Sequence, residues 1–185
     1  MKGRTVYVAL QQFCEEDERP RQLLRAAGCE VRGNTLGRRL RPEVMADALR
    51  GADAVIAGVE PYPGELLRAL PQLRCLSRCG AGTDAIDLKA ARDLGVAVFT
   101  TIDEVVEPVA QMTVAMILAL ARNVPRHLAD MRAGQWKKRT GFLLGEWSIG
   151  LVGFGRIGRA VARLLAPFGP RVLIADPAVT ADAVP

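Results

Sequence analysis

The feature that most constrains the fold of this 185-residue chain is a glycine-rich segment between a predicted strand and a predicted helix. The strand Ser148–Val152 runs directly into Gly153-Phe154-Gly155-Arg156-Ile157-Gly158, and an amphipathic helix is expected over Arg159–Phe168. A G-x-G-x-x-G pattern in this setting predicts a dinucleotide-binding βαβ unit. We expect Gly153 to permit the tight turn, Gly155 to let the backbone approach a pyrophosphate, and Gly158 to let helix and strand pack closely.

Two further features favour binding of an anionic cofactor at this turn. The amides of Arg156 and Ile157 are expected at a helix N-terminus, where unpaired donors and the helix dipole attract phosphate. A second strand, Arg171–Ala175, ends in Asp176, near the spacing at which an acid binds the adenosine ribose hydroxyls. A carboxylate there repels a 2′-phosphate, so NAD is predicted over NADP. A glycine-rich turn that binds nothing is the alternative, and the strand, turn, helix, strand and acid together disfavour it.

The first hundred residues alternate short β-branched runs with helical patterns, which predicts an α/β fold class with a parallel, flavodoxin-like sheet. Gly28, Gly51 and Gly95 stand where left-handed helix stops are expected, and Asp87 is expected to cap a helix. The predicted strands are Thr5–Leu10, Cys29–Arg32, Ala52–Ala57, Leu73–Arg78 and Val96–Phe99, and the predicted helices lie near Arg19–Ala27, Pro42–Arg50, Gly64–Leu70 and Leu88–Leu94.

After Phe99 the pattern changes to a loop, followed by a long apolar helix that opens at Pro108 and continues through Ala121. A second helix is expected over Pro125–Ala133, before the strand that leads into the glycine-rich turn. We therefore predict one domain over residues 1–99 and a second over 100–185, which begins a Rossmann fold and is incomplete. An incomplete sheet would expose apolar faces and an unpaired edge, so we expect a fragment, a companion chain or a degraded gene product.

Composition favours a soluble globular protein, because half of the residues are apolar and the net charge of +5 comes from scattered basic residues. Nucleic-acid binding is not predicted, because the cluster Trp136 to Arg139 combines only one aromatic residue with three cations. No metal site is predicted. The most apolar stretch, Val105–Ala121, is short and interrupted by polar residues, so a buried helix is expected and not a membrane span.

The four cysteines form no C-x-x-C pair and lie in or beside apolar runs, so buried, reduced thiols are predicted. The N-terminus lacks the pattern of a secretion signal. Both observations favour a cytoplasmic location. The cysteines are Cys14, Cys29, Cys75 and Cys79.

Between residues 73 and 177 the chain resembles the D-isomer-specific 2-hydroxyacid dehydrogenases, with the phosphoglycerate dehydrogenases most similar. The resemblance is carried by Arg78-Cys79-Gly80-Ala81-Gly82-Thr83-Asp84-Ala85-Ile86-Asp87-Leu88, by Pro108-Val109-Ala110-Gln111-Met112-Thr113, by Arg132-Ala133-Gly134-Gln135-Trp136, and by the glycine-rich turn. It implies a substrate domain followed by a nucleotide domain, and NAD-dependent oxidation of the CH-OH group of a small 2-hydroxy acid. The substrate is expected to be 3-phosphoglycerate-like or related.

The resemblance also implies site residues in the first domain. The loop Cys79-Gly80-Ala81-Gly82 follows a predicted strand, where ligands bind in open parallel sheets, and its amides could surround a substrate carboxylate. Arg78 is expected either to reach a second anionic group or to be a surface arginine. Thr113 is expected either to touch the nicotinamide half or to be a core threonine.

The resemblance implies catalytic arginine, glutamate and histidine residues late in the nucleotide domain, and none of them is expected in this chain. His127 does not match the family's catalytic position and is interpreted as a partly exposed helix residue. A non-catalytic NAD(H)-binding sensor, similar to corepressors of this architecture, is the alternative function. The apolar helix Val109–Ala121 indicates homodimer packing by analogy, although a core helix has the same pattern.

Overall fold

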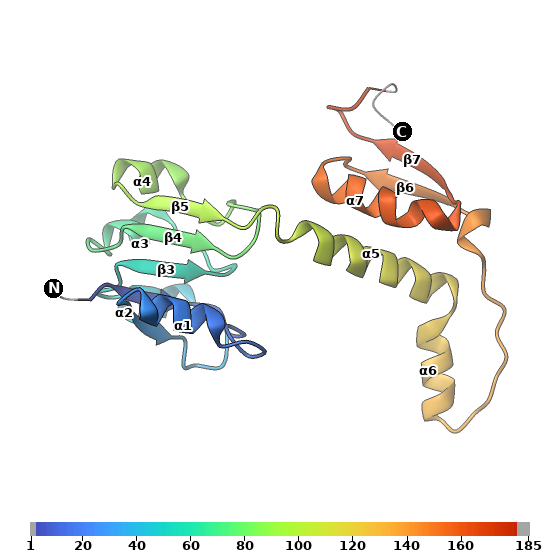
Figure 1. The fold of residues 1–185 in the computed structure, drawn as a ribbon, viewed down its shortest axis with the longest axis horizontal. Coiled ribbons are helices and arrows are strands. Elements are labelled where there is room, and N and C mark those ends of the chain that lie inside the picture. Colours follow the sequence, from blue (N-terminus) through green and yellow to red (C-terminus); the bar gives the residue numbers. More distant parts are fainter. Residues whose placement is uncertain (1–2, 181–185) are drawn as a thin grey trace. The chain divides into compact units, whose positions relative to one another are not determined.

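The computed structural model describes residues 3–180, and the chain divides into two compact units, residues 1–103 and 104–185. The first unit is built on a five-stranded parallel sheet in the order β2-β1-β3-β4-β5 (Figure 1). This is the flavodoxin-like order, so the predicted fold is confirmed. The strands are β1 Thr5–Val8, β2 Glu30–Gly33, β3 Ala54–Ala57, β4 Cys75–Arg78 and β5 Ala97–Thr100.

Three helices of this unit end shortly before the glycines that were predicted to stop them. Gly28, Gly51 and Gly95 have φ angles of 78°, 73° and 70°, values that favour glycine because the Cβ of any other residue would crowd its own following carbonyl. The Oδ1 atom of Asp87 accepts a 2.9 Å hydrogen bond from the amide of Ala90, which confirms the predicted cap. The helices are α1 Arg19–Ala26, α2 Pro42–Ala48, α3 Gly64–Arg68 and α4 Leu88–Asp93.

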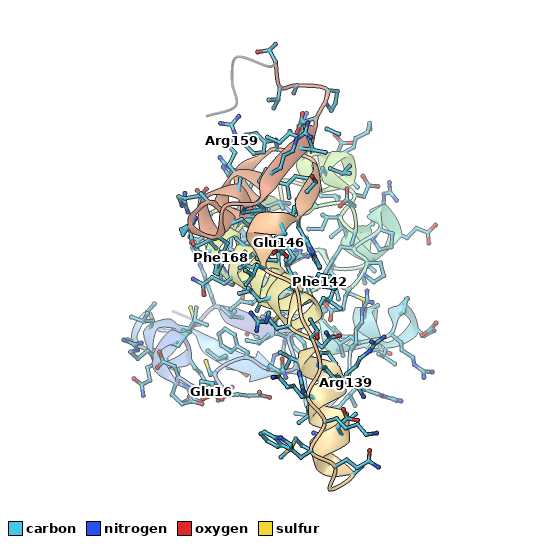
Figure 2. The ribbon with its side chains drawn as sticks, turned by 90° about the vertical axis from the view of Figure 1, so that its right-hand side faces the viewer. Glu16, Arg139, Phe142, Glu146, Arg159 and Phe168 are labelled. Carbon is cyan, nitrogen blue, oxygen red and sulfur yellow. The ribbon has the colours of Figure 1, made fainter. Side chains whose placement is uncertain are left out.

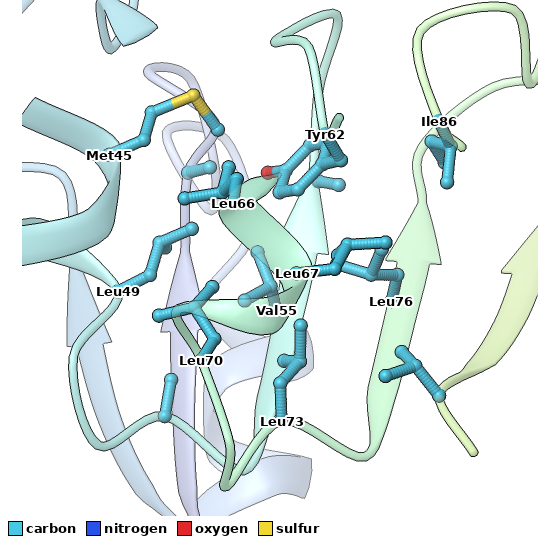
Figure 3. Close-up of a cluster of buried hydrophobic side chains, with 14 of the residues drawn as sticks. Met45, Leu49, Val55, Tyr62, Leu66, Leu67, Leu70, Leu73, Leu76 and Ile86 are labelled. Atoms are coloured by element: carbon cyan, nitrogen blue, oxygen red, sulfur yellow. The ribbon is translucent and has the colours of Figure 1, made fainter. Parts of the chain in front are cut away.

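One buried apolar cluster holds the sheet of the first unit to α2, α3 and α4 (Figure 3). Met45 and Leu49 from the α2 region meet Leu67 of α3 and Leu76 of β4, and all four side chains are almost fully buried. Tyr62 lies in the same cluster with no exposed surface. The buried cluster fixes the strand ends, from which the loops of the candidate site emerge.

The second unit combines a helical pair with a short parallel sheet of β6 and β7 (Figure 1). Helix α5 packs against α7, and Ala110, Val114, Ala160, Val161 and Leu165 form the buried centre of that contact. The elements are α5 Val106–Ala121, α6 Val124–Arg132, the 3-10 turn η1 Leu144–Glu146, β6 Ser148–Val152, α7 Arg156–Leu165, the 3-10 turn η2 Ala166–Phe168 and β7 Arg171–Ala175.

Two helices begin more than one residue before their predicted starts. Helix α7 begins at Arg156 and not at Arg159, because the amide of Arg159 already bonds the carbonyl of Gly155 over 3.0 Å. Helix α5 begins at Val106, so Pro108 lies within the first turn and not at its opening. A proline is tolerated there because the amides of a first turn have no acceptor within the helix.

The prediction of buried cysteines was wrong, because Cys79 is exposed and the other three are only half-buried; all four are free thiols. Cys79 follows the last residue of β4, where the chain leaves the sheet and enters a loop. Burial raises the pKa of the Cys75 thiol, which lies within the strand. Within residues 3–180, no helix has the length and apolar character needed to cross a membrane.

Candidate functional site

The three glycines of the turn after β6 meet three different geometric needs. Gly153 has a φ of 93°, a conformation that side chains rarely adopt, and its amide donates to the carbonyl of Ala175 over 2.8 Å. Gly155 is extended, and a Cβ there would face open space. A Cβ at Gly158 would collide with the carbonyl oxygen of Gly153. Gly158 therefore allows the first turn of α7 to lie on the loop, while the space at Gly155 stays free.

Asp176 lies beside this turn because β6 and β7 run parallel in register, with Val152 opposite Ala175. Its Oδ2 atom accepts a 2.6 Å hydrogen bond from the amide of Phe154, and Oδ1 accepts one of 2.8 Å from the amide of Ala178. These two amides lower the pKa of the Asp176 carboxyl, and the positive charge of Arg159 lowers it further. Asp176 therefore carries a negative charge at neutral pH next to the glycine-rich turn.

Phe154 and Arg159 complete the turn, and sequence reasoning assigned a role to neither. The Nε atom of Arg159 donates to the carbonyl of Phe154 over 3.0 Å, and the guanidinium carbon lies 5.6 Å from the centre of the phenyl ring. Arg159 projects from the first half of α7 (Figure 2), whereas Phe154 is only 3% exposed. No sequence pattern identifies this contact, because it depends on how the turn folds back on the helix.

The other residues predicted at the cofactor site lie in two helices of the second unit. Arg156 and Ile157 are the first residues of α7, so their amides point out of the helix N-terminus, where phosphate is favoured. Thr113 lies in α5, and its hydroxyl donates to the carbonyl of Val109 one turn earlier, over 2.8 Å. Among the described residues, no hydrogen bond joins Thr113 to the glycine-rich turn.

The predicted substrate loop in the first unit is held by two of its own amides. The amide of Cys79 donates to the carbonyl of Ala57 over 2.9 Å, and that of Gly80 donates to the hydroxyl oxygen of Thr101 over 2.7 Å. Within residues 3–180, the amides of Ala81 and Gly82 have no acceptor. The loop can therefore offer two amides to a ligand, fewer than the sequence alone implies.

Arg78 folds back over this loop. One terminal nitrogen of its guanidinium donates to the carbonyl of Cys79, and a Cβ at Gly80 would collide with the same nitrogen. Gly80 has a φ of 137°, a region that favours glycine. The absence of a side chain at Gly80 therefore makes room for the arginine, which lies against Cys79 and Gly80 of the loop.

Glu60, which the sequence analysis did not single out, is the one charged residue that is buried among the described residues, with 4% of its surface exposed. Its Oε2 atom accepts a 3.0 Å hydrogen bond from the amide of Gly58. Two residues further, the Tyr62 amide donates to the Ala85 carbonyl over 2.6 Å, and the Tyr62 carbonyl accepts from the Asp87 amide over 3.0 Å. This segment therefore ties the end of β3 to the residues that follow the substrate loop.

The basic cluster after α6 does not form a row of available cations. Asp130 accepts two hydrogen bonds, of 2.7 and 3.1 Å, from Arg139, which is labelled in Figure 2, and this contact lowers the pKa of Asp130. Trp136, Lys137 and His127 line a surface hollow beside that pair. Because Arg139 is neutralised, the net positive charge of the cluster is smaller than its sequence indicates, which further weakens the nucleic-acid interpretation.

The fold and the glycine-rich turn define the class of protein: an α/β protein with a flavodoxin-like unit and a Rossmann-type βαβ unit. The family model described as the catalytic domain of D-isomer specific 2-hydroxyacid dehydrogenases matches residues 10–185. The chain therefore belongs to the D-isomer specific 2-hydroxyacid dehydrogenases, a family of oxidoreductases, and the resemblance predicted from its motifs is confirmed.

Individual relatives agree with this assignment. A 2-ketogluconate reductase of Gluconobacter oxydans is 37% identical over 131 residues, which are 69% of this chain and 42% of the reductase. The apo-structure of D-lactate dehydrogenase from Escherichia coli is 26% identical, with a TM-score of 0.78, and covers 97% of this chain and 57% of that one. NAD+-bound 3-phosphoglycerate dehydrogenase of Entamoeba histolytica shares the fold, with a TM-score of 0.76 at 22% identity over 98% and 56% of the two chains. The chain thus spans about half the length of these relatives or less.

Proposed function

We propose that the chain provides the NAD-binding turn and the substrate loop of an NAD-dependent oxidoreductase that interconverts a small 2-hydroxy acid and its 2-oxo acid. In that reaction the carbon that bears the hydroxyl gives a hydride to NAD+, and the hydroxyl proton goes to a base. The observation that carries the proposal is the turn itself, in which a negatively charged Asp176 lies beside Gly153, Gly155 and Gly158. Asp176 would accept the ribose hydroxyls, and the amides of Arg156 and Ile157 would face the pyrophosphate.

The substrate site is proposed at the loop after β4. The amides of Ala81 and Gly82 would bind the carboxylate of the acid, and Arg78 would bind a second anionic group, as in a 3-phosphoglycerate-like substrate. Cys79 and Gly80 would hold the loop in shape through the carbonyl of Ala57 and the hydroxyl of Thr101. We assign the catalytic base to no residue of this chain, and Thr113 stays a candidate contact to the nicotinamide half.

Turnover, and not cofactor sensing alone, is the favoured function. The three relatives described above are named as a reductase and two dehydrogenases, and none is named as a regulator. A sensor would change its affinity for a partner when NAD(H) binds, without oxidising any acid. An assay for NADH formation with 2-hydroxy acids, alongside cofactor titration, separates the two functions.

The test of the cofactor site compares Gly155→Val with Gly150→Val. A Cβ at either glycine meets no atom within 4 Å and both positions are exposed, so we expect both variants to fold. Only Gly155 lies in the turn, where the larger side chain would fill the pyrophosphate space. Fluorescence titration with NADH should give binding to the wild type and to Gly150→Val, and at least about tenfold weaker binding to Gly155→Val. Equal affinities for all three folded proteins would contradict the proposed site.

We also propose that a second copy of the chain covers the outer face of α5 and α6. Helix α5 buries only Ala110, Val114 and Ala121, whereas Met112 and Leu120 are 61% and 69% exposed. This exposure favours homodimer packing over the core-helix interpretation of the same pattern. A Leu120→Glu substitution should convert a dimer to a monomer in light scattering, and a wild type that is monomeric at high concentration would contradict the proposal. A complementing chain remains the alternative partner.

A further inference from the structure

Both backbone groups of Phe154 are hydrogen-bonded to side chains of the second unit. Its amide donates to Asp176 over 2.6 Å, and its carbonyl accepts from the Nε atom of Arg159 over 3.0 Å. The guanidinium also lies 5.6 Å from the centre of the phenyl ring, within the range of a cation–π contact. One residue of the turn thereby joins the acid after β7 to a cation on α7.

The charge of Arg159 acts on Asp176 as well as on Phe154. The pKa of the Asp176 carboxyl is lowered first by the amides of Phe154 and Ala178, and then by the positive charge of Arg159. Arg159 is the cation of α7 whose charge lowers the pKa of this carboxyl, whereas Arg163 is paired with Glu107 of α5. Arg159 is therefore the cation of α7 placed to change the electrostatic potential at the acid.

We propose that Arg159 is a specificity-determining residue of the cofactor site, because its guanidinium offsets part of the charge with which Asp176 repels a 2′-phosphate. This inference rests on the proposed NAD-binding function. An aspartate at the end of the second strand favours a ribose with a free 2′-hydroxyl, whereas an arginine nearby accommodates the phosphate. Because the Asp176 carboxylate and the Arg159 guanidinium lie at the same turn, the ratio by which NADH is preferred over NADPH is smaller than Asp176 alone would give.

The competing explanation is that Arg159 only packs the turn. In that case its removal would weaken the binding of NADH and NADPH to the same extent, because both cofactors use the same pyrophosphate contacts. A change in electrostatic potential at the ribose weakens the binding of NADPH more than that of NADH, because only NADPH carries the 2′-phosphate, and the resulting change in the ratio of the two affinities decreases with salt. The ratio and its salt dependence are therefore readouts that a packing role does not change.

The experiment uses the full chain and three variants. Arg159→Gln keeps an N–H donor and loses the charge, Arg159→Lys keeps the charge, and Arg163→Gln removes an exposed cation about one turn away on the same helix. Circular dichroism first checks that each protein is folded. Dissociation constants for NADH and NADPH are then measured by fluorescence titration at low and high salt.

We expect Arg159→Gln to raise the ratio of the NADPH to the NADH dissociation constant by about threefold at low salt, and by less at high salt. Arg159→Lys and Arg163→Gln should leave the ratio close to that of the wild type. If the wild type binds NADH and folded Arg159→Gln has the same ratio of dissociation constants, the role of Arg159 is overturned and the proposed function is not. A folded wild type that binds neither dinucleotide overturns the proposed function, and this inference with it.

Discussion

The amide of Phe154 donates a 2.6 Å hydrogen bond to the carboxylate of Asp176, although 22 positions separate the two residues in the chain. The acid proposed to bind the ribose therefore also closes the turn proposed to bind the pyrophosphate. Its negative charge is stabilised by two backbone amides before any cofactor is present. Substitutions at Asp176 should accordingly affect the stability of the second unit as well as cofactor affinity.

The contribution of Asp176 to stability should depend on pH. Its pKa in the folded chain lies below the ordinary value of 3.8, so its stabilising effect is complete above that value and is lost as the pH falls through the lowered pKa. We expect Asp176→Ala to lower the melting temperature near neutral pH, and the gap to the wild type to narrow as the pH falls below about 4. Thermal unfolding over a pH series measures this gap. Asp176→Asn is the matched control, because it keeps an oxygen acceptor without the charge, and a gap that is constant at all pH values would count against the prediction.

Gly158→Ala should destabilise the second unit, because its Cβ would collide with the backbone carbonyl of Gly153 and neither atom can move without distorting the turn. Overpacking of this kind costs about 1–3 kcal/mol. Urea unfolding measures the free energy difference. Gly155→Ala is the control, since its Cβ would meet no atom within 4 Å and should change stability little. Equal stabilities for the two variants would show that the turn relaxes freely.

Gly80→Ala should disturb the substrate loop in two ways. A side chain is strained at a φ of 137°, and the Cβ would collide with the guanidinium of Arg78. We expect a loss of about 1–3 kcal/mol and displacement of Arg78 from the Cys79 carbonyl. Chemical unfolding measures the loss, and a crystal structure of the variant shows the arginine. In the control Gly82→Ala the nearest atom is a flexible carboxylate oxygen of Asp84, at 3.2 Å, so a smaller loss is expected.

Tyr62→Phe should leave the first unit as stable as the wild type, or stabilise it by up to about 1 kcal/mol. The hydroxyl of Tyr62 is buried and has no hydrogen-bond partner among the described residues. Folding therefore removes it from water without a compensating hydrogen bond, and the Phe variant does not have this cost. The same burial raises the pKa of the phenol well above its usual value. Equilibrium unfolding in urea tests the prediction, with Leu67→Ala as a control that should cost about 2–5 kcal/mol through the cavity it creates. A clear loss of stability in Tyr62→Phe would mean that the hydroxyl has a hydrogen-bond partner.

The sequence by itself determined the α/β class, the flavodoxin-like strand order, the glycine helix stops and the family. These features follow from local patterns: alternation of strand and helix periodicity, glycine where φ must be positive, and a turn motif with fixed spacing. The cap at Asp87 was predictable for the same reason, since its partner Ala90 is three residues away. The cap and the helix stops depend on residues that are neighbours along the chain, and the class, the strand order and the family follow from the order in which such local patterns occur.

Only the tertiary structure decided which groups of the candidate site are available. The sequence did not indicate that Ala57 and Thr101 use two of the substrate-loop amides, or that Cys79 is exposed. It likewise gave no sign that Phe154 joins Asp176 to Arg159. These contacts bring together residues that are distant in the chain or folded back on a turn, and their geometry depends on strand register and helix packing, which no local pattern encodes.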